Sequence, residues 1–225
     1  MKIGIIGSGL IGGKLGLLWA QSGHEVTFSY SRSEEKLRKL ARQAGGRFAS
    51  IAQTVTQADV LLLAVHWSRI DDVLFQAGDL GGKIVVNCCV PLDLKDRDLV
   101  LGVSTSGAEE LLRKCPSARW VSAFNTNPSE AFADVFASRH EKPRPQLLYY
   151  GDDAGAKGVA ARLIADIGYE PLDAGPLRTA RFVEPFAMVT AELAYEQPGG
   201  PKLTYRFSKF DEGNLRNSNA SMVPA

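Results

Sequence analysis

A glycine pattern close to the N-terminus constrains this chain more than any other feature. Gly7, Gly9 and Gly12 form a G-x-G-x-x-G motif between an apolar run at residues 2–6 and a helical stretch at residues 10–22. In this context the first glycine permits a tight turn, the second leaves room for a pyrophosphate, and the third lets helix and strand pack closely. The motif therefore predicts a dinucleotide-binding turn.

The same turn supplies the first candidate binding residues. Backbone N–H groups at the start of a helix face an anion along the helix dipole, and a serine hydroxyl adds a further donor. A glycine-rich turn that binds nothing is the alternative, but the strand, turn, helix and second strand in register favour binding. The residues expected around the pyrophosphate are Gly7, Ser8, Gly9, Leu10, Ile11 and Gly12.

The end of the second expected strand lacks the acidic residue that selects NAD. In NAD-binding units an Asp or Glu about 20 residues after the glycines accepts a hydrogen bond from the ribose 2′-hydroxyl. This chain has Ser31 and Arg32 there, followed by Lys36 one helical turn later. A guanidinium forms two parallel hydrogen bonds with a phosphate, which a carboxylate would repel. The three residues predict NADP(H), the alternative being an ordinary solvated helix start.

Short β-branched runs alternate with helical stretches along the rest of the chain. Strands apolar on both faces and separated by helices predict a largely parallel sheet covered on two sides. We therefore expect an α/β fold: a Rossmann-type, doubly wound, mainly parallel sheet with a small helical C-terminal part. The further strands are expected at residues 25–30, 47–49, 59–65, 83–87, 120–124, 146–151 and 170–173, and the further helices at 34–43, 51–57, 70–76, 106–114, 128–137, 154–167 and 177–195.

Length and composition exclude several classes of protein. The 225 residues are 45% hydrophobic and 23% charged, as in a soluble globular chain, and 26 basic against 25 acidic residues give a net charge of +1. We expect no nucleic-acid or membrane partner, because the chain has no strong field and no apolar run of about 20 residues. The N-terminus, broken by glycines, is expected to belong to the mature protein. Three cysteines without a C-x-x-C spacing fit a reducing, cytoplasmic location.

The chain divides at about residue 175. Residues 1–175 are expected to form the NADP-binding Rossmann domain, and residues 176–225 a C-terminal helix and tail that pack on the domain or on a partner subunit. Within that helix one apolar stripe covers the chain's own sheet or a partner, as in a homodimer. From about residue 213 the tail is expected to be mobile. The stripe consists of Phe182, Phe186, Val189 and Leu193.

Ligands of such sheets lie beyond the carboxyl ends of the strands. We expect Ala64, Val65, His66 and Asn125, which follow the fourth and sixth strands, to contact the nicotinamide half of the cofactor. His66 is a candidate proton donor, although a single histidine at a strand end is more often structural. The sequence contains no Ser-His-Asp order, Tyr-x-x-x-Lys pair or metal-ligand cluster, so it predicts neither hydrolysis nor a metal site.

Several strings occur together in this chain: GSGLIGG, SRSEEK, VSAFNTNPSEAF, the GDD of residues 151–153 and the PLDAGPLRTARFVEP of residues 171–185. In this combination the chain resembles the coenzyme F-420-dependent NADP oxidoreductases, or deazaflavin reductases, over residues 1–196. The resemblance implies a dimeric Rossmann protein that moves hydride between NADPH and a deazaflavin ring. It also implies that the glycine turn holds pyrophosphate and that Ser31, Arg32 and Lys36 hold the 2′-phosphate.

Two departures from the family pattern lie where the second substrate would stack. The chain reads Val65-His66-Trp67 where many members read V-P-W, and CCVPL at residues 88–92 where they read N-P-L or P-L-V-P. The resemblance therefore extends to the NADP half and leaves the second ring open, as coenzyme F-420 or a flavin.

Three functions fit the sequence. The leading hypothesis is an NADPH-dependent oxidoreductase that transfers hydride between NADP(H) and a deazaflavin or flavin ring, since stacked rings need no side-chain acid. The second is reduction of a small imine or carbonyl with His66 as donor. The third is a non-catalytic NADP(H)-binding sensor or scaffold. In the first two, the partner is a small-molecule electron acceptor or donor.

Overall fold

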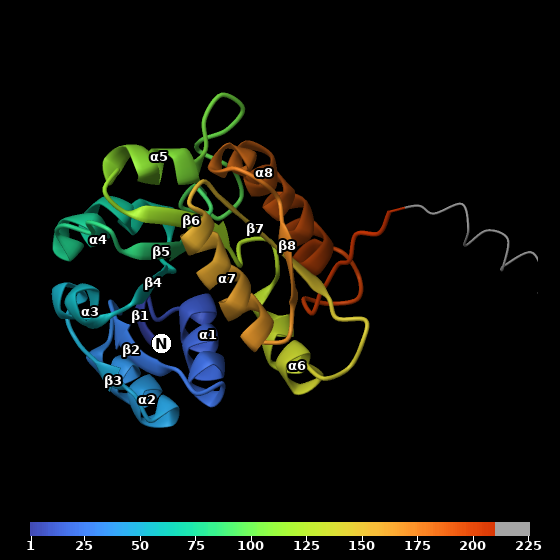
Figure 1. Cartoon of the computed structure of the whole chain (residues 1–225). Coiled ribbons are helices and arrows are strands. Elements are labelled where there is room, and N and C mark those ends of the chain that lie inside the picture. Colours follow the sequence, from blue (N-terminus) through green and yellow to red (C-terminus); the bar gives the residue numbers. More distant parts are fainter. Residues whose placement is uncertain (210–225) are drawn as a thin grey trace, which may run out of the picture.

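A computed structural model describes residues 1–209 and shows one eight-stranded sheet between two layers of helices (Figure 1). The strand order is β3-β2-β1-β4-β5-β6-β7-β8. The predicted class, a Rossmann-type, mainly parallel α/β sheet with a small helical C-terminal part, is confirmed. The strands are β1 (Lys2–Ile6), β2 (Glu25–Ser29), β3 (Arg47–Phe48), β4 (Val60–Leu63), β5 (Ile84–Asn87), β6 (Arg119–Ala123), β7 (Gln146–Gly151) and β8 (Glu170–Asp173).

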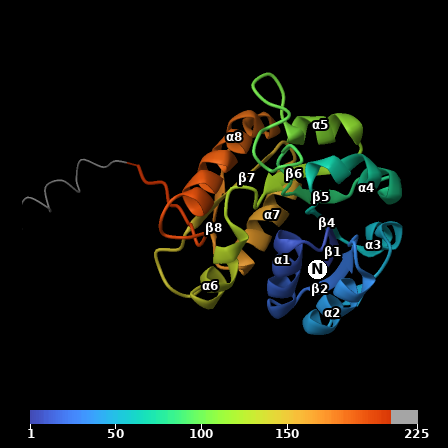
Figure 2. The ribbon, with the colours of Figure 1, turned by 180° about the vertical axis from the view of Figure 1, so that it is seen from behind.

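Helices cover both faces of the sheet (Figure 2). One face carries α1 (Leu10–Gln21), α2 (Glu34–Ala44), α6 (Phe132–Ala137) and α7 (Ala154–Asp166). The other carries α3 (Ile51–Gln57), α4 (Ile70–Ala77), α5 (Gly107–Lys114) and α8 (Ala180–Ala191). Short helical turns η1 (Trp67–Arg69), η2 (Ser129–Ala131) and η3 (Leu177–Thr179) precede α4, α6 and α8, and η4 (Glu192–Glu196) follows α8. No helix within residues 1–209 is long and apolar enough to cross a membrane.

Alternate residues of the central strands enter two separate cores. Ile5 and Leu62 pack under α1 and α7, whereas Ile6 and Leu61 pack under α3 and α4. Burial on both faces is the origin of the continuous apolar runs in the sequence. The indole N–H of Trp19 donates to the Leu163 carbonyl at 3.0 Å and joins α1 to α7.

The last two strands run against the rest of the sheet. Strands β1 to β6 are parallel, while β7 pairs with β6 in the antiparallel sense, with Val121 opposite Gly151 and Ala123 opposite Tyr149. A strand buried on both faces has the same apolar pattern in either direction, so the sequence does not reveal this reversal. The reversal brings the start of β7 to the edge where the parallel strands end.

The C-terminal helix buries a different face from the predicted stripe. Phe182, Val189 and Leu193 are 65%, 52% and 49% exposed, so of the two predicted alternatives, the one in which they cover the chain's own sheet is wrong. Only Phe186 of the stripe is partly buried, against Tyr205 of the tail. The buried side of α8 holds Ala180, Val183, Glu184, Ala187 and Thr190. The tail from residue 213, for which we expect mobility, lies outside the described residues.

A buried carboxylate fixes α8 against α5. Glu184 is 1% exposed, and its two oxygens accept the N–H groups of Gly107 at 2.8 Å and Ala108 at 3.0 Å. These N–H groups lie in the first turn of α5, where they have no partner within the helix. Beside this contact, Arg181 of α8 forms a two-bond ion pair with Glu109 of α5.

Glu184 makes the stability of this contact depend on pH. Burial outweighs the two N–H bonds and raises the pKa of its carboxyl from 4.5 to about 7. In this pH range the folded state therefore retains a proton that the unfolded state releases. The free energy of unfolding falls as pH rises from about 4.5 to 7, by about 1.4 kcal/mol for each unit of difference between the two pKa values. In thermal unfolding from pH 5 to 8, we expect Glu184→Gln to flatten this loss relative to the wild type.

Glu109→Gln is the matched control for that measurement. The guanidinium of Arg181 lowers the pKa of Glu109, so this carboxylate stabilises the fold above its unfolded pKa and loses its effect in acid. Its variant should differ from the wild type least at low pH. A Glu184→Gln curve that stays parallel to the wild type across the range would contradict our assignment.

Candidate functional site

The glycine turn leaves a hollow at the start of α1. Gly7 has φ +104, and a Cβ there would collide with the Ala64 carbonyl; a Cβ on Gly12 would collide with the Gly7 carbonyl. A Cβ on Gly9 would meet nothing within 4 Å, so it would project into open space. Among residues 1–209, no side chain caps the N-terminus of α1. The turn thus brings bare backbone donors to a surface that an anion can approach.

A hollow of about 560 Å³ extends from this turn to the start of α2, and we name it the cationic hollow. Arg32, Lys36 and Arg69 line it, and within residues 1–209 none of the three forms an ion pair. No acidic residue of the described chain lines it. Three unpaired cations beside backbone donors fit a polyphosphate with an additional phosphate group.

Six of the nine predicted phosphate-binding residues line this hollow, namely Gly7, Ser8, Gly9, Ser31, Arg32 and Lys36, whereas Gly12 lines neither cavity. Ser31 lines it and accepts the N–H of Ser33 at 3.2 Å, while Ser33 caps α2 and fixes the position of Lys36. The Ser8 hydroxyl, predicted as a donor to pyrophosphate, instead donates to the Ser29 carbonyl at 3.3 Å in the buried interior. Ile11 and Leu10 lie at the start of α1 and line the neighbouring cavity.

Two residues that line the cationic hollow, Arg69 and Tyr30, were not predicted from the sequence. Arg69 comes from η1 after β4, which is adjacent to β1 in the sheet although it is far from the glycine turn in sequence. Tyr30 has φ +57 at the end of β2, and its hydroxyl donates to Asp72 of α4 at 2.8 Å. Burial raises the pKa of Tyr30, so it closes the rim of the cationic hollow as a neutral group.

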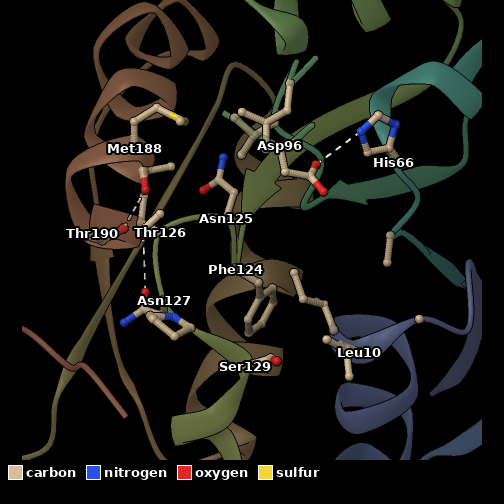
Figure 3. A pocket seen from close by; sticks show the side chains of 18 of the residues that line it. Leu10, His66, Asp96, Phe124, Asn125, Thr126, Asn127, Ser129, Met188 and Thr190 are labelled. Atoms are coloured by element: carbon tan, nitrogen blue, oxygen red, sulfur yellow. Dashed lines mark hydrogen bonds and ion pairs between the residues drawn. The ribbon is translucent and has the colours of Figure 1, made fainter. Parts of the chain in front are cut away.

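A second cavity of about 490 Å³ adjoins the first, and we name it the apolar cavity (Figure 3). The two share Gly9, Ala64, Val65 and His66 as lining residues. The carboxyl ends of β4, β5 and β6, the loop that follows β5, and one side of α8 enclose it. All four residues predicted for the nicotinamide half line it: Ala64, Val65, His66 and Asn125.

His66 is held at the boundary between the two cavities. The N–H of Ser68 donates to Nδ1 at 3.1 Å, which makes Nδ1 an acceptor and places the ring proton on Nε2. Nε2 lies 3.1 Å from the Asp93 carbonyl and 3.2 Å from an oxygen of Asp96. Both ring nitrogens therefore have protein partners, and Figure 3 shows the ring turned toward Asp96. In this arrangement His66 caps η1 and anchors the loop after β5.

Asn125 presents an unused acceptor at the centre of the cavity wall. Its Nδ2 donates to the Tyr150 hydroxyl at 2.8 Å, and its buried Oδ1 has no hydrogen-bond partner in the described chain. In Figure 3, Asn125 lies between the α8 residues Met188 and Thr190 and the His66–Asp96 pair. A buried oxygen without a partner is unusual in folded proteins, because its desolvation costs free energy.

Residues from α8 and the tail complete the wall. Met188, Thr190 and Tyr195 line the apolar cavity, and the neighbouring Thr126 lies 2.7 Å from the Tyr205 hydroxyl. The helical pattern predicted α8 but did not indicate which of its sides faces the sheet edge. The Tyr195 hydroxyl donates to Glu130 at 2.9 Å, and burial together with this carboxylate raises its pKa to about 12.

Residues 2–91 match the family model described as NADP oxidoreductase, coenzyme F420-dependent. This match confirms the predicted resemblance over residues 2–91. Metalloreductase STEAP3 of Rattus norvegicus is 31% identical over 189 residues, which are 81% of this chain and 36% of the relative. The chain thus spans about a third of that relative's length.

Solved structures share the fold. A putative F420-dependent NADP-reductase from Arthrobacter sp. FB24 superposes with a TM-score of 0.81 at 24% identity, covering 93% of this chain and all of its own. A hypothetical protein, SMa0349 of Sinorhizobium meliloti, has a TM-score of 0.67 at 28% identity over 92% of this chain and 96% of its own. An imine reductase from Streptomyces aurantiacus has a TM-score of 0.61 at 18% identity, over 85% and 62%.

Two glycine variants separate binding from folding. Gly9→Ala adds a methyl group to open space, so we expect an unchanged melting temperature and at least about tenfold weaker NADPH binding, or about 1.4 kcal/mol. Gly12→Ala should lower the melting temperature, because its Cβ collides with backbone. Calorimetric titration and thermal unfolding measure the two effects. Unimpaired NADPH binding by Gly9→Ala would place the pyrophosphate elsewhere.

The cationic hollow should select the phosphorylated cofactor. We expect Arg32→Ala to weaken NADPH binding by about tenfold or more while NADH binding stays nearly constant, since a charge-assisted contact to a phosphate is lost. Arg69→Ala should act in the same direction. Arg38→Ala is the control, because Arg38 lies on α2 but pairs with Glu34 and lines neither cavity. Equal losses for both cofactors in the titration would refute the assignment.

Proposed function

We propose, from the match of residues 2–91 to the coenzyme F420-dependent NADP oxidoreductases, that this protein is an NADPH-dependent oxidoreductase. It would transfer hydride between NADP(H) and a deazaflavin or flavin ring. When bound, NADPH supplies a hydride to the acceptor ring and leaves as NADP⁺, and the acceptor takes its remaining proton from solvent. The observation that carries the proposal is the adjoining pair of cavities, one cationic and one apolar.

The residues present fit the dinucleotide. Gly9 leaves space for the pyrophosphate, and the uncapped start of α1 supplies donors to it. Arg32, Lys36 and Arg69 provide unpaired charge for the 2′-phosphate. Ala64 and Val65, which line both cavities, form the floor between the phosphate end and the reacting end.

The apolar cavity supplies confinement rather than acid catalysis. Its titratable side chains within the described residues are His66, Asp96 and Tyr195, and the protons of His66 and Tyr195 are already directed at protein acceptors. Hydride transfer between stacked rings depends on proximity and on exclusion of water, not on a side-chain acid. The closed hydrogen-bonding of His66 favours this chemistry over reduction of an imine or carbonyl with His66 as donor.

Anaerobic mixing tests the proposal. Protein and NADPH are combined with riboflavin, FMN or coenzyme F-420, and the absorbance of cofactor and acceptor is followed. We expect NADPH to be oxidised only when a ring acceptor is present, and more slowly when the transferred hydrogen is deuterium. Among the variants, Gly9→Ala should show the largest fall in the rate of this oxidation. Arg38→Ala serves again as the control for handling and folding.

Two outcomes would replace the proposal. Oxidation of NADPH with a small imine or carbonyl but with no ring acceptor would assign the second function. Tight NADPH binding without acceptor-dependent oxidation would assign a sensor or scaffold.

The division at residue 175, the homodimer and the cytoplasmic location stay predictions from the sequence. Exposed Phe182 and Val189 on α8 offer a surface for the dimer.

A further inference from the structure

Three segments that line the apolar cavity meet behind its wall, at the first residue of α5. A Cβ on Gly107 would lie 3.0 Å from Pro91 and 3.2 Å from both the Trp67 ring and the Glu184 carboxylate. These three side chains belong to different parts of the wall, namely the loop after β5, η1 and α8. The start of α5 is therefore the point at which the positions of all three segments are set against one another.

Glu184 is the polar link at this junction. Its side chain is buried, and no Lys or Arg of residues 1–209 forms an ion pair with it. Its two oxygens accept the N–H groups of Gly107 and Ala108 instead. Apolar packing between helices is not directional, whereas two hydrogen bonds to one carboxylate fix both a distance and a direction. The carboxylate therefore fixes α8 against the neighbouring α5 (Figure 1).

Glu184 does not line the apolar cavity, but residues on both sides of the junction do. On one side, Val90 and Leu92 flank Pro91 in the loop after β5. On the other side, positions three, four and seven after Glu184 share its face of the helix. The cavity-lining residues of α8 are Ala187, Met188, Thr190 and Ala191. A movement of α8 relative to α5 would therefore change the width of the cavity.

The stability of the fold does not require a carboxylate at this place. Burial raises the pKa of Glu184 to about 7, because the charged form loses its hydration. A buried charge without a cation costs free energy, and an apolar side chain of similar size is often as stabilising. The partly exposed Arg181–Glu109 pair already joins the same two helices. Glu184 therefore contributes geometry more than stability.

We propose that Glu184 is a positioning residue for the ring acceptor, because it holds α8 at the distance from Trp67 and from the loop after β5 at which the apolar cavity accepts a planar ring. This inference rests on the proposed function and assigns acceptor affinity to a residue outside the cavity. Binding of NADPH should depend on it little, because no residue of α5 or α8 in the described chain lines the cationic hollow.

Glu184→Gln tests the inference, since the amide oxygen keeps one hydrogen bond and the amide nitrogen cannot accept the other. Binding of FMN and of coenzyme F-420 is measured by their own fluorescence in the presence of NADP⁺, which donates no hydride. We expect the Kd of the acceptor to rise at least about fivefold, the effect of one lost hydrogen bond. With NADPH, the KM for the acceptor should rise with it. The calorimetric Kd of NADPH should stay within about twofold, since every phosphate contact is kept.

Gly107→Ala reaches the same junction from α5. Its methyl group would press on Pro91, Trp67 and Glu184 together, so we expect it also to weaken acceptor binding and to spare NADPH binding. Glu109→Gln is the matched control, because it breaks the other contact between the two helices and lines neither cavity. This control should change stability and leave acceptor binding unchanged. Thermal unfolding verifies that each variant is folded at the assay temperature.

The outcomes distinguish the inference from the function beneath it. Weaker acceptor binding in Glu184→Gln and Gly107→Ala, with NADPH binding kept and Glu109→Gln like the wild type, supports the inference. Unchanged acceptor binding in Glu184→Gln, or equal losses in Glu184→Gln and Glu109→Gln, overturns it and leaves ring-to-ring hydride transfer standing. If neither FMN nor coenzyme F-420 binds the wild type or oxidises NADPH, the proposed function fails and the inference fails with it.

Discussion

The close approach of α1 to the ends of β1 and β4 determines the geometry of the whole site. The carbonyl of Gly7 occupies the position that a Cβ of Gly12 would need, and the Ala64 carbonyl occupies the position that a Cβ of Gly7 would need. Backbone therefore packs against backbone where side chains normally separate a helix from a sheet. As a result the first turn of α1 lies directly over the sheet edge, beside the place where the two cavities meet at Gly9.

Local patterns predicted the elements of this fold and part of its candidate site. The glycine spacing, the absent acid near Arg32 and the doubly apolar strands act through neighbours in the sequence, so they were visible there. Arg69 and Asp96 were not identified because they reach the site from other βα units and depend on which strands lie side by side. Helical periodicity revealed that α8 has an apolar side, but Glu184, a charged residue, lies on the side that is buried.

His66 lies where the sequence predicted it, and its hydrogen bonds there are all with the protein. Its place after β4 predicted contact with the cavity, and the structure puts it there. The hydrogen bonds of Ser68, two residues later, and of the loop at Asp93 and Asp96 occupy both of its nitrogens. The sequence does not show these hydrogen bonds, because the loop lies about 30 residues beyond His66. The loop comes close to His66 only because β5 lies next to β4 in the sheet.

Tyr205 gives the end of the described chain an unexpected reach. It pairs with Gln146 at the start of β7, and its hydroxyl meets Thr126 in the wall of the apolar cavity. The segment around Tyr205 therefore supports that wall. Truncating the chain before Tyr205, or fusing a second polypeptide there, would change the wall of the apolar cavity at Thr126, more than seventy residues away in the sequence.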